Sequence, residues 1–243
     1  MRLGRGGYFA AARHPWACAL FVLPLLAAYE VGMLLEGPGQ QEYCRNGADL
    51  WLRALLGRAG LAHESWAPVL LAAGLLGWSW RRRQDRPREL GPVWLGMVLE
   101  SAALAVGLWG VCHLVWPLLH PAQVPCAGPA CDPTVERMLG YAGAGIYEEA
   151  LFRLLLLSAL RWLVVQADLP GMGGVALAGL LSALLFSLAH HAGPQGEAFD
   201  AQVFFFRTLA GLYFAALYLC RGFGIAVGAH AGYDVLVGVL LEA

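Results

Sequence analysis

Long apolar stretches alternate with short polar segments along most of the chain. Seven stretches have about the 17–25 residues that a helix needs to cross the hydrocarbon core of a bilayer. They cover roughly residues 15–35, 64–80, 92–119, 138–165, 171–191, 203–220 and 222–241. The second is short, and little more than Arg221 separates the last two. The pattern predicts an all-α protein, a polytopic membrane helix bundle of about seven transmembrane helices.

A shorter segment, residues 48–60, mixes apolar and charged positions. It is predicted to form an amphipathic helix lying at the membrane surface. The first apolar stretch is long and no clear cleavage site follows it, so we interpret residues 15–35 as a membrane span and not as a signal peptide.

The composition agrees with a membrane protein. Hydrophobic residues make up 59% of the chain and charged residues only 14%, against about 25% charged residues in soluble domains. With a net charge of −1, no nucleic-acid partner is predicted and the lipid bilayer is the expected surrounding. The chain has no lysine and is rich in Gly, Ala, Leu and Arg, which favours a bacterial protein of the inner (cytoplasmic) membrane.

The arginine distribution predicts the orientation, because cytoplasmic loops carry an excess of positive charge. Ten loop arginines, five of them within residues 81–88, fall on one side of the predicted bundle, and five fall on the other. The N-terminus is therefore expected in the cytoplasm and the C-terminus outside. The loop with Cys126 and Cys131 then lies outside, where disulfides form. The spacing leaves open whether these two cysteines are bonded.

The fourth stretch contains charges that a membrane span rarely retains without a function or a partner. These are Glu148, Glu149 and Arg153. Glu149 and Arg153 are four residues apart and share a helix face, so they can pair. Glu148 points about 100° away from Glu149 and is left for chemistry. For the Glu149–Arg153 pair, a purely structural ion pair remains an equally good interpretation.

Two later spans carry similar groups. Phe186 and His190 lie one turn apart in the fifth, and His230 and Asp234 lie one turn apart in the seventh. At about 1.5 Å per residue, Glu148, His230 and Asp234 lie at similar depths and His190 lies near the outer end of its span. We expect these groups to converge in the outer half of the bilayer, with Phe186 as a wall of the pocket.

Three other features invite interpretation. The small residues of 140–145 predict close packing of the helix that carries Glu148. Glu30 and Glu100 also fall within predicted spans. We expect Glu30 to reach toward an interface and Glu100 to pair with a neighbouring span, and either could line a substrate groove.

The order Glu-Glu-x-x-x-Arg, Phe-x-x-x-His, His-x-x-x-Asp over residues 148–153, 186–190 and 230–234 resembles the CPBP family of intramembrane glutamic proteases. This family includes the type II CAAX prenyl endopeptidases and the bacterial Abi proteins, and the resemblance covers about 136–241. It implies that Glu148 activates a water that His190 helps to hold. It implies an oxyanion stabilised by His230 and residue 234, with Glu149 and Arg153 in support.

Asp234 departs from the prenyl endopeptidases, which have asparagine there, although bacterial members of the family also have aspartate. An ionised aspartate cannot donate a hydrogen bond. Asp234 is therefore either protonated, or an acceptor that orients His230, or the oxyanion donor is another group.

Glu148, His190 and His230 are also suitable zinc ligands. No His-Glu-x-x-His motif is present. We predict metal-free catalysis without a cofactor, with a zinc site as the alternative.

The resemblance divides the chain into residues 1–135, with membrane spans, the interfacial helix and extracytoplasmic loops, and residues 136–243, a CPBP-type catalytic bundle, within one integral membrane unit. The predicted function is an intramembrane endopeptidase acting on a membrane-anchored protein or peptide, such as a C-terminal tail, propeptide or sorting signal. The alternatives are a non-catalytic bacteriocin-immunity or scaffold protein of the same family and, with least support, a proton-coupled transporter. The sequence does not determine the oligomeric state.

Overall fold

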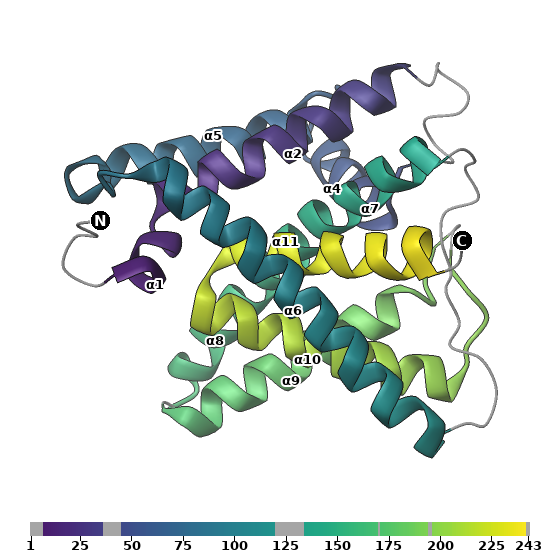
Figure 1. The fold of residues 1–243 in the computed structure, drawn as a ribbon. Helices are drawn as coiled ribbons and strands as arrows, with labels where there is room; N and C mark the ends of the chain where they lie inside the picture. The colour runs from purple at the N-terminus through teal and green to yellow at the C-terminus, as the bar shows by residue number, and fades with distance from the viewer. Residues whose placement is uncertain (1–6, 36–44, 120–133, 170, 194–195, 242–243) are drawn as a thin grey trace.

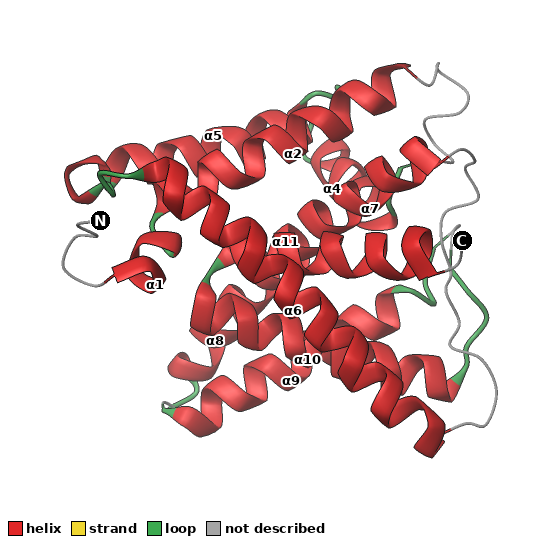
Figure 2. Cartoon of the chain, viewed as in Figure 1, coloured by secondary structure: helices red, strands yellow, loops and turns green. Residues whose placement is uncertain are grey.

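Helices form every regular element in the part of the chain that the computed structural model describes, residues 7–35, 45–119, 134–169, 171–193 and 196–241 (Figures 1 and 2). The predicted all-α fold is confirmed. The α-helices are α1 (Gly7–Ala12), α2 (Pro15–Leu35), α4 (Gly47–Arg58), α5 (Trp66–Arg81), α6 (Leu90–Leu119), α7 (Thr134–Glu149), α8 (Ser158–Gln166), α9 (Met172–Ala189), α10 (Ala201–Arg221) and α11 (Phe223–Val235). A 3-10 turn, η1 (Arg83–Asp85), and two π-helical segments, η2 (Ala150–Leu157) and η3 (Leu236–Leu241), complete the described elements.

The helices follow the predicted spans closely. Within the described residues, five are long and apolar enough to cross a membrane: α2, the Leu90–Leu114 part of α6, α9, α10, and α11 with η3. Of the two other predicted spans, α5 has only 16 residues and the fourth is divided by a π-helical segment. Cys126 and Cys131 lie outside the described residues.

A single long helix carries the glutamate pair, because α7, η2 and α8 follow one another without a break over residues 134–166. The π-helical register of η2 begins directly after Glu149. Two serine hydroxyls donate to backbone carbonyls of this segment: Ser182 Oγ to Phe152 O at 2.9 Å and Ser158 Oγ to Arg153 O at 3.4 Å. π-helical segments are rare in proteins and are found frequently at functional sites.

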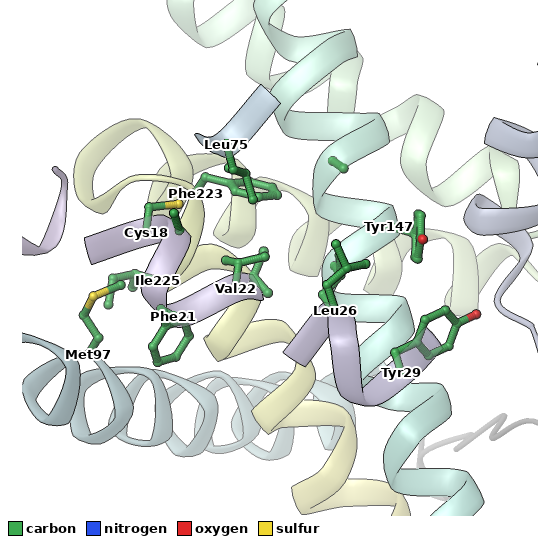
Figure 3. Close-up of a cluster of buried hydrophobic side chains, with 14 of the residues drawn as sticks. Cys18, Phe21, Val22, Leu26, Tyr29, Leu75, Met97, Tyr147, Phe223 and Ile225 are labelled. Atoms are coloured by element: carbon green, nitrogen blue, oxygen red, sulfur yellow. The ribbon is translucent and has the colours of Figure 1, made fainter. Parts of the chain in front are cut away.

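The core gathers around α2, which packs against α5, α6, α7 and α11 (Figure 3). Apolar burial of this kind holds the N-terminal helices to the helices that carry the predicted site. The residues that point into this cluster and are labelled in Figure 3 are Cys18, Phe21, Val22, Leu26 and Tyr29 of α2, with Leu75, Met97, Tyr147, Phe223 and Ile225 of the neighbouring helices.

The close packing predicted for residues 140–145 is confirmed where α7 meets α11. A Cβ added at Gly145 would lie 2.8 Å from Ala231 Cβ and 2.9 Å from the Val227 carbonyl oxygen. Backbone atoms cannot move aside as a flexible side chain can. Only glycine therefore fits at this crossing. The close approach brings Glu149 within reach of His230.

Gly145→Ala is expected to destabilise the fold by about 1–3 kcal/mol, because the added methyl group pushes α7 and α11 apart. The thermal unfolding midpoint in detergent measures the effect. Gly74→Ala on α5 is the matched control, because nothing lies within 4 Å of its added Cβ. Equal midpoints for the two variants would contradict the close-contact explanation.

The predicted amphipathic helix is present as α4, with an ion-pair network on its inner face. Asp49 is completely buried and pairs with Arg45 Nη1 at 2.8 Å and Arg53 Nε at 2.6 Å. The Tyr29 hydroxyl of α2 donates to Asp49 at 3.0 Å. These contacts fix α4 against the bundle.

Candidate active site

Three helices bring the predicted acids and imidazoles together. Glu148 lies at the end of α7, His190 at the C-terminal end of α9, and His230 within α11. Glu148 Oε2 lies 3.6 Å from His230 Nε2 and 3.9 Å from His190 Nε2. Polar atoms at these separations are too far apart for a direct hydrogen bond and can be bridged by water. The Glu148 carboxyl group thus faces the two histidines.

Glu149 is a completely buried bridge between two helices. Its Oε1 accepts a hydrogen bond from His230 Nδ1 at 2.8 Å and lies 3.2 Å from Arg153 Nη1. The predicted pairing of Glu149 with Arg153 is confirmed. Because Nδ1 of His230 carries the proton that it donates to Glu149, the other ring nitrogen, Nε2, is the one that faces Glu148.

Arg153 completes this buried group. Its Nη2 donates to Gly211 O of α10 at 3.2 Å, and its guanidinium carbon lies 4.4 Å from the centre of the Phe186 ring. A cation over an aromatic face is attracted by the ring quadrupole. Arg153 therefore links its own helix to α9 and α10 as well as to Glu149.

The orientation of His190 is fixed by its own helix. Its Nδ1 donates to the Phe186 carbonyl oxygen at 2.9 Å, and its ring packs edge-on against the Phe186 ring at 4.9 Å between centroids. A carbonyl oxygen can only accept, so Nδ1 holds the proton and Nε2 is directed at Glu148.

Two aromatic rings lie beside His230. The ring of Phe186 lies 6.1 Å from that of His230. Phe214 of α10 stacks on His230 with centroids 4.3 Å apart and planes 11° apart. Sequence reasoning did not single out Phe214, since its partner is sixteen residues away on another helix.

Asp234 lies beside His230 but not at the ring nitrogen that Glu149 binds. Its Oδ2 lies 3.6 Å from His230 Nε2, the same nitrogen that faces Glu148. Glu149 instead occupies Nδ1, as described above. Asp234 and Glu148 therefore lie beside the same nitrogen of the His230 ring.

The sequence pattern gave no partner for Glu148, but the structure shows one. Asn46, the residue that caps α4, donates from Nδ2 to Glu148 Oε1 at 2.8 Å across 102 residues of sequence. Sequence reasoning missed this residue. The Asn-Gly pair before an amphipathic segment marks a helix start, but nothing local indicates that its amide reaches a glutamate on a distant span.

The two other intramembrane glutamates are engaged elsewhere. Glu100 binds Arg221 at 2.5 and 2.8 Å and accepts from the Tyr8 hydroxyl at 2.6 Å, so its predicted pairing with a neighbouring span is confirmed. Glu30 was expected to reach toward an interface. It binds Arg53 at 3.0 and 3.2 Å and accepts from the Tyr147 hydroxyl, within the network of α4.

An ion pair joins α10 to the loop that precedes it. Arg207 binds Glu197 through two hydrogen bonds of 2.8 Å, and these bonds hold the pKa of the Glu197 carboxyl below its usual range. The backbone N–H of Glu197 donates to the His190 carbonyl at 2.9 Å. The pair therefore secures the loop that follows His190.

Among the described residues, no three His, Cys, Asp or Glu side chains are arranged to hold a metal ion. The fold and the site together define a class: a polytopic helical membrane protein with buried acid and imidazole groups facing one another between three helices.

The comparison with protein families gives a more specific assignment. Residues 132–236 match the family described as type II CAAX prenyl endopeptidase, Rce1-like. Over this segment, which contains all of the predicted site residues, the chain is similar to that CAAX protease family. This similarity supports a peptidase at the level of the family. No curated protein and no solved structure matches the chain.

Proposed function

We propose that the protein is an intramembrane endopeptidase in which Glu148 activates the hydrolytic water. The observation that carries this proposal is the placement of Glu148 Oε2 at 3.6 and 3.9 Å from the Nε2 atoms of His230 and His190. Water held among these three atoms has a proton acceptor beside it and a fixed direction of attack.

In the proposed reaction, Glu148 takes a proton from water as the oxygen attacks the carbonyl carbon of the substrate peptide bond. A tetrahedral intermediate with a negatively charged oxygen forms. Glu148 then passes its proton to the leaving nitrogen as the C–N bond breaks, giving a carboxylate and an amine. His190 holds the water through Nε2, which is unprotonated when Nδ1 donates to the Phe186 carbonyl.

The donor to the oxyanion is assigned to Nε2–H of protonated His230. An ionised Asp234 has no proton to donate. At 3.6 Å from Nε2 it supplies a counter-charge to the imidazolium instead. Preorganised donors of this kind usually contribute the largest part of the stabilisation of an oxyanion. The hydrogen bond to Glu149 keeps the imidazole ring in place while Nε2 acts.

The proposed substrate is a membrane-anchored protein or peptide, cut at a C-terminal tail, a propeptide or a sorting signal. The arginine distribution supports a site in the outer half of a bacterial inner membrane. In Figure 1, α1 and the turn between α5 and α6 lie at one end of the bundle, and the last residues of η3 lie at the other. That arrangement agrees with a cytoplasmic N-terminus and an extracytoplasmic C-terminus.

The orientation is tested by reporter fusions. A reporter inserted within residues 81–88 is expected to give a cytoplasmic signal, because arginine-rich loops are retained inside. A reporter at the C-terminus is expected to give an extracytoplasmic signal. The reverse pattern would place the site on the cytoplasmic side and redirect the search for substrates.

The function is tested in the native host by comparing the termini of membrane proteins in cells with the wild-type protein and with Glu148→Gln. A polypeptide that accumulates uncut in the variant identifies both activity and substrate. Glu100→Gln is the matched control, because it also removes an intramembrane carboxylate but one bound to Arg221 and Tyr8. Unchanged termini together with a retained phenotype would favour the non-catalytic immunity or scaffold function.

A further inference from the structure

Asn46 makes two hydrogen bonds with the two ends of its amide. Oδ1 accepts from the backbone N–H of Ala48 at 2.8 Å, which caps the N-terminus of α4. Nδ2 donates to Glu148 Oε1 at 2.8 Å. The first bond settles the assignment of the second: a backbone N–H can only donate, so the atom facing Ala48 is the oxygen and the atom facing Glu148 is the nitrogen.

The position of Asn46 is held from both sides. Its backbone N–H lies 3.4 Å from the Tyr29 hydroxyl oxygen of α2, to which it donates. Tyr29 in turn donates to the buried Asp49, whose partners Arg45 and Arg53 also pair with Glu30 of α2. This network leaves little freedom for the start of α4 to move away from Glu148.

The two carboxylate oxygens of Glu148 therefore have different partners. Oε1 is bound by Asn46, and Oε2 is the atom that faces His190 and His230. A carboxylate that rotates about its last torsion exchanges its oxygens, since that torsion is broad. The Asn46 bond opposes this rotation and keeps one oxygen directed at the two imidazoles.

We propose that Asn46 is a positioning residue for the glutamate base, delivered to the site by the interfacial helix α4. The inference rests on the proposed function for its effect on rate, but the contact itself is open to an independent test. Asn46 acts through Glu148 and is not assigned a contact with substrate. It therefore affects the turnover number, kcat, more than the Michaelis constant, KM.

Three substitutions of Asn46 separate its capping of α4 from its hydrogen bond to Glu148. Asn46→Asp keeps a good N-cap and loses the donor, Asn46→Gly keeps most of the capping preference and loses the donor, and Asn46→Ala loses both. With the full-length protein in lipid vesicles, the probe is the membrane polypeptide recovered uncut from Glu148→Gln cells. All three variants are expected to lower kcat by about 10- to 100-fold, the range for losing a hydrogen bond to a charged group. Asn46→Asp is expected to lose most, because it places a like charge beside Glu148.

Thermal stability is expected to distinguish the loss of the helix cap from the loss of the donor. The unfolding midpoint should fall further for Asn46→Ala than for Asn46→Gly, because both lose the donor and only Asn46→Ala loses the capping preference. Asn46→Asp should also lower it, because of the like charge beside the buried Glu148. If Asn46 had a purely structural role, each variant would lose kcat in proportion to its loss of thermal stability. Wild-type kcat in Asn46→Asp and Asn46→Gly would overturn the inference, provided that Glu148→Gln is inactive.

Infrared spectroscopy tests the contact without any substrate. The difference spectrum between wild-type and Glu148→Gln protein isolates the carboxylate stretching band of Glu148. Asn46→Gly is expected to shift this band, because a carboxylate oxygen loses a hydrogen bond. An unshifted band would overturn the inference even if Glu148→Gln has abolished cleavage. A shifted band with an active Glu148→Gln variant would instead retain the contact and reject the proposed function.

Discussion

Purified Glu148→Gln protein in lipid vesicles is expected to cleave its membrane-anchored substrate about 10²–10⁴-fold more slowly than the wild-type protein, the usual contribution of a general base. Glutamine keeps the shape of the side chain but cannot take a proton from water. Its amide can still contact Asn46 and the histidines. The fold is therefore expected to survive, and the loss should fall on kcat.

Mass spectrometry of the products over time measures the rate, with Glu100→Gln as the control that retains it. A Glu148→Gln rate within a few-fold of the wild-type rate would contradict the assignment of the base. Activity that is lost to a chelator and restored by zinc would assign the Glu148, His190 and His230 groups to a metal instead.

Replacing Arg153 by Met is expected to destabilise the protein by about 3–5 kcal/mol, because it leaves Glu149 buried without its counter-charge. Arg153 and Glu149 are both completely buried, so water cannot take over the interaction. The loss of the Gly211 contact and of the packing on Phe186 adds to the effect. Equilibrium unfolding in mixed micelles, followed by tryptophan fluorescence, measures the change in free energy.

The double variant Arg153→Met with Glu149→Gln is the matched comparison. It removes both charges, and replacing a whole buried ion pair is often close to neutral. The carboxamide oxygen of Gln can still accept from His230 Nδ1. Much of the lost stability is therefore expected to return in the double variant, with a coupling free energy of about 0.5–3 kcal/mol. Additive losses from the two single substitutions would contradict the pairing.

The fold could be predicted largely from the sequence because lipid leaves few alternatives. A span of apolar residues in a bilayer has to form a helix or join a closed barrel, so hydrophobic length fixes most helix boundaries. The predicted range 15–35 coincides with α2, and the predicted range 171–191 differs from α9 by one and two residues at its ends. The π-helical segments were not predicted, because they depend on backbone register and not on the apolar pattern.

The candidate site could be predicted only in part, for a related reason. Helical periodicity gives partners within one helix, and the Glu149–Arg153 contact follows from it. Contacts between helices have no such local signal. The bonds of His230 with Glu149 and of Asn46 with Glu148 join residues 81 and 102 positions apart, and only the packed structure brings them together.

The bond between Asn46 and Glu148 also limits how the chain can be dissected. The family match begins at residue 132, whereas Asn46 and the tyrosine that holds it come from helices that precede this segment. A fragment restricted to the matched residues would retain the acids and imidazoles yet lack the amide that donates a hydrogen bond to Glu148. The apolar face that α7 and α11 present to α2 would also be uncovered in it. A chain shortened to the matched segment is therefore expected to lose both a contact of the candidate site and part of its packing.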